Sequence, residues 1–191
     1  KAFENAVIVA SAIGGSSNCT THLSAIAKHM GIKFDLSNWQ KLGHEIPLLV
    51  NCQPAGEYLM ESFYRAGGVP AVMQELIKHK KIHTNIMTVS GKTVGINLKR
   101  KIETDNKVIK TFKDCLTEKA GFLVMKSNFF DSAIMKTSVI SKDFRERYLS
   151  NPKHPNAFVG KAVVFEGPED YHKNINNKKL NIDENSILII R

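Results

Sequence analysis

The sequence predicts an α/β protein with two parts, and two observations lead to this prediction. Before residue 98, apolar residues recur at helical spacing around a short apolar run at 48–50, which suits a strand buried on both faces of a parallel sheet. After residue 121, apolar runs of strand length predominate. We therefore expect residues 1–98 to be the C-terminal part of an α/β sheet domain and residues 121–191 to be the first strands of a β-barrel-like domain. The polar, poorly periodic residues 99–120 are expected to form a linker.

Composition and charge narrow the class of protein. With 42% hydrophobic residues, the chain has the composition of a globular protein, and no apolar run approaches the length of a membrane span. The formal net charge is +9, but the basic residues are mostly scattered, so we expect neither a nucleic-acid partner nor a membrane partner. The chain starts without a signal-peptide pattern and stops on the apolar run 187–190, so both ends look cut from a longer polypeptide.

The cysteines are Cys19, Cys52 and Cys115, an odd number without a Cys-x-x-Cys pair. This pattern argues against a disulfide framework and against a tetrahedral zinc site, and it favours free structural thiols. Free thiols are typical of a reducing compartment, so we expect a cytoplasmic protein, or a mitochondrial one if the source is eukaryotic.

A glycine turn near the start organises the first half of the chain. An apolar run of β type at residues 6–10 leads to glycines at 14–15, and Ser16, Ser17 and Asn18 follow. Glycines allow a sharp turn, and the three polar side chains are able to cap the helix predicted after them. A helix N-terminus with exposed N–H groups and hydroxyls nearby suits an anion such as a carboxylate or phosphate. An ordinary turn and cap explains the same residues, and the pattern is not that of a P-loop.

Further helices are predicted in order along the first half. A short helix at 37–42 has Asp35 as a cap candidate, and its Trp39 is expected to be a packing anchor. Another helix is predicted at 58–66, and the next begins at Pro70, where the missing N–H of proline costs nothing.

The second half carries the predicted strands and one short helix. Each strand is a run of apolar residues four or five positions long, and the runs are 122–125, 133–136, 161–165 and 187–190. The helix is predicted at 169–175, after a Gly-Pro turn. About four strands are too few to close a barrel, so the barrel-like domain is expected to be incomplete.

Several motifs together resemble one enzyme family. Residues 14–18, Gly-Gly-Ser-Ser-Asn, with His-Leu at 22–23 and Ala-Ile-Ala at 25–27, resemble a segment of the dihydroxy-acid dehydratase and phosphogluconate dehydratase family. Further matching motifs follow in the family's order, at residues 46–51, 54–61, 66–73 and 90–95. The later motifs at 131–138 and 165–172 are most similar to the sugar-acid branch, the arabinonate and xylonate dehydratases. The resemblance covers nearly the whole chain, as an internal segment of the family's longer sequence.

The resemblance implies a hydro-lyase that removes water from a 2,3-dihydroxy acid, either a sugar acid or a branched-chain acid, to give a 2-keto acid. It also implies a [2Fe-2S] cluster that acts as Lewis acid on the leaving hydroxyl, a Mg²⁺ ion that holds the carboxylate, and a catalytic serine. The family motifs that supply these groups lie outside the matched segment, so we expect no catalytic residue and no metal ligand here. The resemblance further implies a homo-oligomer, a dimer or tetramer, at full length.

The resemblance and the cap pattern together select four residues for substrate binding. We expect Ser16, Ser17 and Asn18 to border the substrate cavity, while Asn128 matches a motif that opens the second domain. Lys136 belongs to the same region, although a strand lysine is more often solvated, with only its stem buried. The alternative is a catalytically inactive short relative that acts as a structural or partner subunit.

Overall fold

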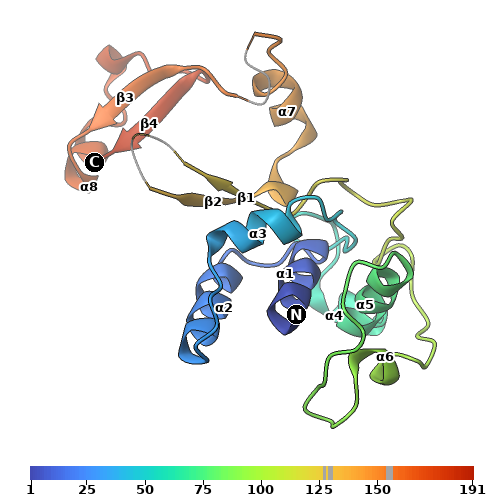
Figure 1. The fold of residues 1–191 in the computed structure, drawn as a ribbon. Helices are drawn as coiled ribbons and strands as arrows, with labels where there is room; N and C mark the ends of the chain where they lie inside the picture. The colour runs from blue at the N-terminus through green and yellow to red at the C-terminus, as the bar shows by residue number, and fades with distance from the viewer. Residues whose placement is uncertain (127, 129–130, 154–156) are drawn as a thin grey trace. The chain divides into compact units, whose positions relative to one another are not determined.

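The structure is a computed structural model that describes residues 1–126, 128, 131–153 and 157–191. It divides into two compact units, Lys1–Val139 and Ile140–Arg191 (Figure 1). The first unit is mainly helical, and the second contains a parallel strand pair with its helices. Each unit is described by itself.

The first unit begins with helices α1, Ala2–Ala12, and α2, Asn18–His29. The prediction of a β-type run at residues 6–10 is wrong, because these residues lie within α1. A short apolar run does not distinguish a buried strand from a buried helix by periodicity. Here the helix is enclosed by the core, and Val7 and Ala12 have no exposed surface.

Helix α3, Leu36–Gly43, begins at a capping box. The Asp35 carboxylate accepts a hydrogen bond from the Ser37 N–H at 2.9 Å, and the Asn38 side chain accepts one from the Asp35 N–H at 3.0 Å. Trp39 is fully buried and meets Phe122 edge-on, with ring centroids 4.9 Å apart. Both the Asp35 cap and the anchoring role of Trp39 are confirmed.

The apolar run 48–50 is buried as predicted, but it does not lie in a parallel sheet. It forms isolated antiparallel bridges instead, Leu48 with Thr117 and Val50 with Ile109. The Leu48 N–H donates to the Thr117 carbonyl at 2.8 Å, and the Lys110 N–H donates to the Leu49 carbonyl at 2.7 Å. The run pairs this way because the chain after residue 107 returns beside it and supplies its own apolar side chains.

That returning chain belongs to residues 99–120, the segment predicted to be a linker. Val108 and Ile109 are buried in the same cluster as Leu49 and Val50. The compact units of the structure divide between residues 139 and 140. This division does not test the domain boundaries predicted from the sequence, which stay a prediction.

Three further helices complete the helical part of the first unit: α4, Met60–Arg65, α5, Gly68–Lys78, and α6, Val94–Asn97. Phe63 of α4 and Val72 and Leu76 of α5 point into the main core cluster. The Tyr58 N–H donates to the Asn51 carbonyl at 3.0 Å, which places the chain just before α4 beside the loop that follows residue 50.

The first unit ends with a strand pair. Strands β1, Phe122–Met125, and β2, Ala133–Lys136, are antiparallel, with Phe122 opposite Lys136. A 3-10 turn, η1, Thr137–Val139, follows at once. The Thr137 side chain donates to the Gly121 carbonyl at 2.7 Å, which fixes the end of β2.

The second unit contains helix α7, Lys142–Tyr148, helix α8, Pro168–Asn174, and the short turn η2, Lys178–Leu180. Its strands β3, Lys161–Phe165, and β4, Ser186–Ile190, are parallel neighbours, with α8 in the connection between them. The four strand positions predicted from the sequence are confirmed to within a residue. The continuation into a β-barrel stays a prediction. Among the described residues, none of the helices has the length and hydrophobicity that a membrane crossing needs.

Candidate functional site

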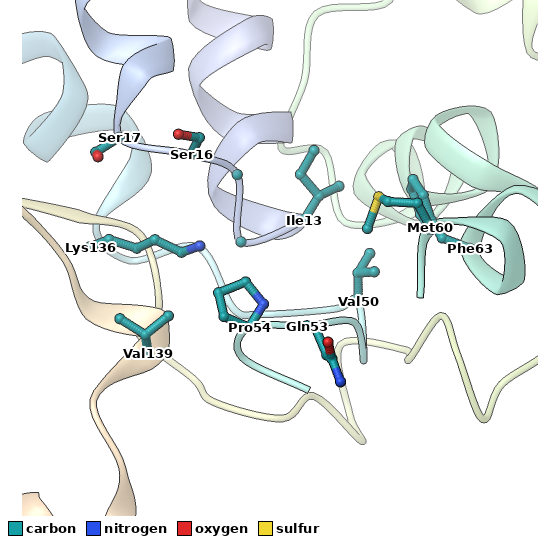
Figure 2. Close-up of a pocket in the computed structure, with 12 residues that line it drawn as sticks. Ile13, Ser16, Ser17, Val50, Gln53, Pro54, Met60, Phe63, Lys136 and Val139 are labelled. Carbon is teal, nitrogen blue, oxygen red and sulfur yellow. The ribbon is translucent and has the colours of Figure 1, made fainter. Parts of the chain in front are cut away.

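The first unit contains a cavity of about 640 Å³ beneath the glycine turn (Figure 2). Its wall combines the loop between α1 and α2, the chain at residues 50–54, helix α4, the end of β2 and η1. The lining residues are Ile13, Gly14, Gly15, Ser16, Ser17, Val50, Gln53, Pro54, Met60, Phe63, Lys136 and Val139.

The glycine pair shapes the upper wall of this cavity. The Gly15 N–H donates to the Ala10 carbonyl at 2.7 Å and the Gly14 N–H donates to the Ser11 carbonyl at 3.1 Å, which is the Schellman pattern of a helix end. Gly14 has a φ of +64°, and a Cβ there would lie 2.9 Å from Leu48 Cδ1. Position 14 therefore needs glycine both for its left-handed backbone and for its close approach to a buried side chain.

The serines that follow line the cavity, and their hydrogen bonds differ from the predicted cap. Ser17 occupies the N-cap position of α2 but its side chain forms no cap bond. The Ser16 Oγ instead accepts a hydrogen bond from the Asn18 N–H at 3.2 Å. The next N–H groups, those of Cys19 and Thr20, donate to the Ser16 and Ser17 carbonyls. The first-turn N–H groups are thus engaged within the loop, and the hydroxyl groups are what the loop presents to a ligand.

The two predicted asparagines lie elsewhere. Asn18 and Asn128 are both exposed, and neither is among the residues that line the cavity. Their proposed roles in substrate binding stay predictions. The structure brings together Ser16, Ser17 and Lys136 from the residues singled out in the sequence.

Lys136 is a cationic side chain of the cavity wall (Figure 2). Burial lowers the pKa of its ammonium group from the ordinary value, and the neighbouring Cys19 acts in the opposite direction. The described residues that line the cavity include no aspartate or glutamate. The cavity therefore combines one positive charge with the serine hydroxyls.

The opposite wall is apolar. Val50 and Phe63 are 1% and 8% exposed, and Ile13 and Pro54 also line the cavity. A largely apolar cavity with a few convergent polar groups is the usual form of a small-molecule site. This arrangement suits a small organic anion that also carries hydroxyl groups.

The described residues do not fit a metal centre. Cys19, Cys52 and Cys115 are free thiols, and among the residues with described positions no group of three or more metal-ligating side chains comes together. The His83 Nε2 lies 2.6 Å from a carboxylate oxygen of Glu4, as an ion pair at the surface. The implied cluster and Mg²⁺ ligands are expected in parts of the family's longer chains, and this stays a prediction.

Two family models match the chain, each over one of its halves. The model described as Dihydroxy-acid/6-phosphogluconate dehydratase N-terminal matches residues 1–99, and the corresponding C-terminal model matches residues 107–191. The chain belongs to the dihydroxy-acid/6-phosphogluconate dehydratase family. The resemblance seen in the sequence motifs is confirmed.

Curated relatives in this family are named dehydratases. The chain is 49% identical to the D-xylonate dehydratase of Caulobacter vibrioides, 38% identical to the L-arabinonate dehydratase of Rhizobium leguminosarum and 37% identical to the dihydroxy-acid dehydratase of Caldicellulosiruptor saccharolyticus. Each match covers 100% of this chain but only 31% or 32% of the relative. The chain thus spans about a third of the length of these relatives.

Sequence reasoning did not assign the apolar wall to the site. Gln53, Pro54 and Met60 fall within or beside a family motif at 54–61, yet no local pattern indicates that they share a cavity with the serines. Their position depends on the buried run before them, which brings the loop after residue 50 against the glycine turn. The motif match was the one available signal.

Proposed function

We propose that this chain is a segment of a hydro-lyase that dehydrates a 2,3-dihydroxy acid to a 2-keto acid. The observation that carries the proposal is the family match over both halves of the chain. Among the relatives compared above, identity is highest with the D-xylonate dehydratase, at 49%. We therefore take a sugar acid as the preferred substrate and a branched-chain dihydroxy acid as the second candidate.

The cavity beneath the glycine turn is the part of the substrate site that this segment contributes. The Ser16 and Ser17 hydroxyls hydrogen-bond the hydroxyl groups of the acid, because a hydroxyl both donates and accepts. The Val50 and Phe63 side chains form an apolar wall that excludes water from the bound acid. The rigid helix end at Gly14 holds the serines in place, so the loop is preorganised for binding.

The chemical step belongs to groups outside this segment. The [2Fe-2S] cluster implied by the resemblance would supply Lewis-acid catalysis at the leaving hydroxyl, and the implied Mg²⁺ would hold the carboxylate. The role proposed for the residues of this segment is to bind and orient the acid. The predicted homo-oligomer and compartment remain part of the proposal.

The test is the formation of 2-keto acid by the intact enzyme. Its intact mass is measured first, because a mass well above 21.3 kDa shows that the polypeptide extends beyond these residues. Five-carbon aldonates and 2,3-dihydroxyisovalerate are then compared as substrates. Keto acid from the aldonates supports the sugar-acid assignment. No keto acid from either, with the metal groups present, would favour the inactive relative.

The cavity's role is tested by Ser17→Ala in the same enzyme. We expect a rise in KM of a few-fold to tenfold, since one hydrogen bond contributes about 0.5–1.5 kcal/mol. Thr21→Ala is the matched control, because Thr21 is exposed on the same helix and does not line the cavity. Unchanged KM and kcat in Ser17→Ala would contradict the assignment of the cavity as the substrate site.

A further inference from the structure

One loop of the proposed substrate site is held by a residue that is not itself among those lining the cavity. Gln53 and Pro54 form part of the cavity wall, and they belong to the loop that joins the buried run 48–50 to helix α4 (Figure 2). We propose that Asn51 is the positioning residue of this loop, and that binding of the acid depends on it through Gln53 and Pro54. The inference rests on the proposed function, which makes the cavity a substrate site.

The Asn51 side chain joins two separate segments of the chain. Asn51 is 8% exposed. Its Oδ1 accepts a hydrogen bond from the Glu57 N–H at 3.1 Å, within the loop, and its Nδ2 donates to the Lys107 carbonyl at 3.2 Å, outside the loop. Both ends of the carboxamide are thus used, one as acceptor and the other as donor. A buried amide of this kind fixes the segments that it joins, because breaking either bond leaves a polar group unpaired.

Backbone hydrogen bonds close the loop around this side chain. The Asn51 N–H donates to the Val108 carbonyl at 2.8 Å, and the Asn51 carbonyl accepts from the Tyr58 N–H at 3.0 Å. The Gln53 N–H donates to the Tyr58 carbonyl at 2.9 Å. The two ends of the loop are therefore tied to each other, and its start is tied to the chain that returns beside residues 48–50.

The packing at Gly56 is consistent with the same role. A Cβ at position 56 would lie 2.4 Å from the Asn51 Oδ1 and 2.5 Å from the Asn51 carbonyl carbon. The loop thus folds closely over the Asn51 carboxamide, and an alanine at position 56 would displace it. Gly56→Ala therefore disturbs the Asn51 contact without changing Asn51 itself.

The position of the loop matters for binding more than for the chemical step. A site binds more tightly when its wall already has the bound arrangement, because less conformational freedom is lost on binding. The proposed catalytic groups lie outside this segment, so a loosened wall should raise the KM of the acid and leave kcat nearly unchanged. An asparagine with a structural role alone would affect stability without this selective effect on KM.

The experiment compares two buried asparagines in the intact enzyme. Asn5 is 5% exposed, and its Nδ2 and Oδ1 are hydrogen-bonded to the His83 carbonyl and N–H, both at 2.8 Å. It is not one of the residues that line the cavity, so Asn5→Ala removes a similar pair of amide hydrogen bonds elsewhere in the first unit. The test variants are Asn51→Ala, Asn51→Asp and Gly56→Ala.

Three measurements are made on each variant. Urea unfolding gives its stability, and steady-state kinetics give KM and kcat for the acid that the unaltered enzyme turns over. Hydrogen exchange gives the protection of the Glu57 N–H, which should fall in Asn51→Ala because its acceptor is removed, and should not change in Asn5→Ala.

In Asn51→Ala we expect KM to rise about two- to tenfold at a nearly unchanged kcat, the effect of losing one hydrogen bond at the site. Gly56→Ala should also raise KM. Asn51→Asp keeps an acceptor for the Glu57 N–H but has no donor for the Lys107 carbonyl, so its KM should rise less. Asn5→Ala should lower the unfolding midpoint to a similar degree and leave KM unchanged.

An unchanged KM in Asn51→Ala, or an equal rise of KM in Asn5→Ala, would overturn the inference. If Asn51→Ala does not fold, Asn51→Asp decides in its place, and an unchanged KM there counts against the inference. Failure of the proposed function gives a different result. The unaltered enzyme then forms no keto acid, while faster exchange of the Glu57 N–H in Asn51→Ala alone still shows that Asn51 positions the loop.

Discussion

Replacing Gly14 by alanine should destabilise the first unit more than the same change at another left-handed glycine. Gly14 and Gly31 have similar φ angles, +64° and +68°, so both substitutions carry the conformational cost of about 1–2 kcal/mol for a left-handed alanine. They differ in their surroundings. A Cβ at position 14 would lie 2.9 Å from Leu48 Cδ1, whereas a Cβ at position 31 meets nothing within 4 Å.

The difference between the two variants isolates the packing cost. Leu48 is 1% exposed, so it has little room to move, and overpacking a core typically costs about 1–3 kcal/mol. After the gain of about 0.4–1 kcal/mol from the stiffer unfolded chain, we expect Gly14→Ala to lose about 1–4.6 kcal/mol in total and Gly31→Ala to lose about 0–1.6 kcal/mol.

Urea unfolding followed by tryptophan fluorescence measures both values. Trp39 is fully buried in the same unit and is the single tryptophan of these 191 residues, so in a polypeptide without further tryptophans its emission reports this unit directly. The urea concentration at the unfolding midpoint should fall, while the slope of the unfolding free energy against urea concentration stays unchanged. This combination marks a change in stability alone. Equal losses in the two variants would show that Leu48 yields freely, and would refute the argument that position 14 requires glycine for packing.

Two further predictions concern charged groups of the first unit. The hydrogen bond from His83 lowers the pKa of Glu4 from 4.5, so its stabilising contribution is present above pH 4.5 and is lost as the pH falls through the lower folded-state pKa. Unfolding midpoints between pH 3 and pH 6 should therefore depend less on pH in His83→Gln, and an unchanged acid dependence would contradict this reasoning. Glu75→Ala should lose about 1–3 kcal/mol, because it leaves the Phe112 N–H, now bonded to Glu75 at 3.1 Å, without its acceptor. Urea unfolding measures this loss of stability. The control is Glu61→Ala, which removes an exposed ion pair with Arg65 and should lose less than about 1 kcal/mol.

Local signals in the sequence were sufficient for elements whose conformation is set by near neighbours. The cap at Asp35 depends on residues two and three positions away, and the strand at 161–165 on its own apolar run. The run at 6–10 was misassigned because its burial on all sides removes the periodicity that marks a helix. Packing against distant segments, rather than the local preference for helix or strand, determined the conformation of residues 6–10.

Contacts between distant segments could not be read from the sequence. The partner of the run 48–50 lies about sixty residues later, in a stretch whose many charges suggest a linker. The candidate site depends on the same kind of contact, since Lys136 and Ser16 are 120 positions apart and meet only in the folded unit. Family motifs indicated that both regions matter, but not that they share a cavity.

The return of the chain beside residues 48–50 has a consequence for exchanging segments between relatives. Val108 and Ile109 lie in the region matched by the C-terminal family model, yet they complete the core of the N-terminal one by packing with Leu49 and Val50. A recombination event that joined two relatives near residue 100 would pair halves with mismatched core side chains. The two regions therefore share one core cluster in this chain, although each one matches a separate family model.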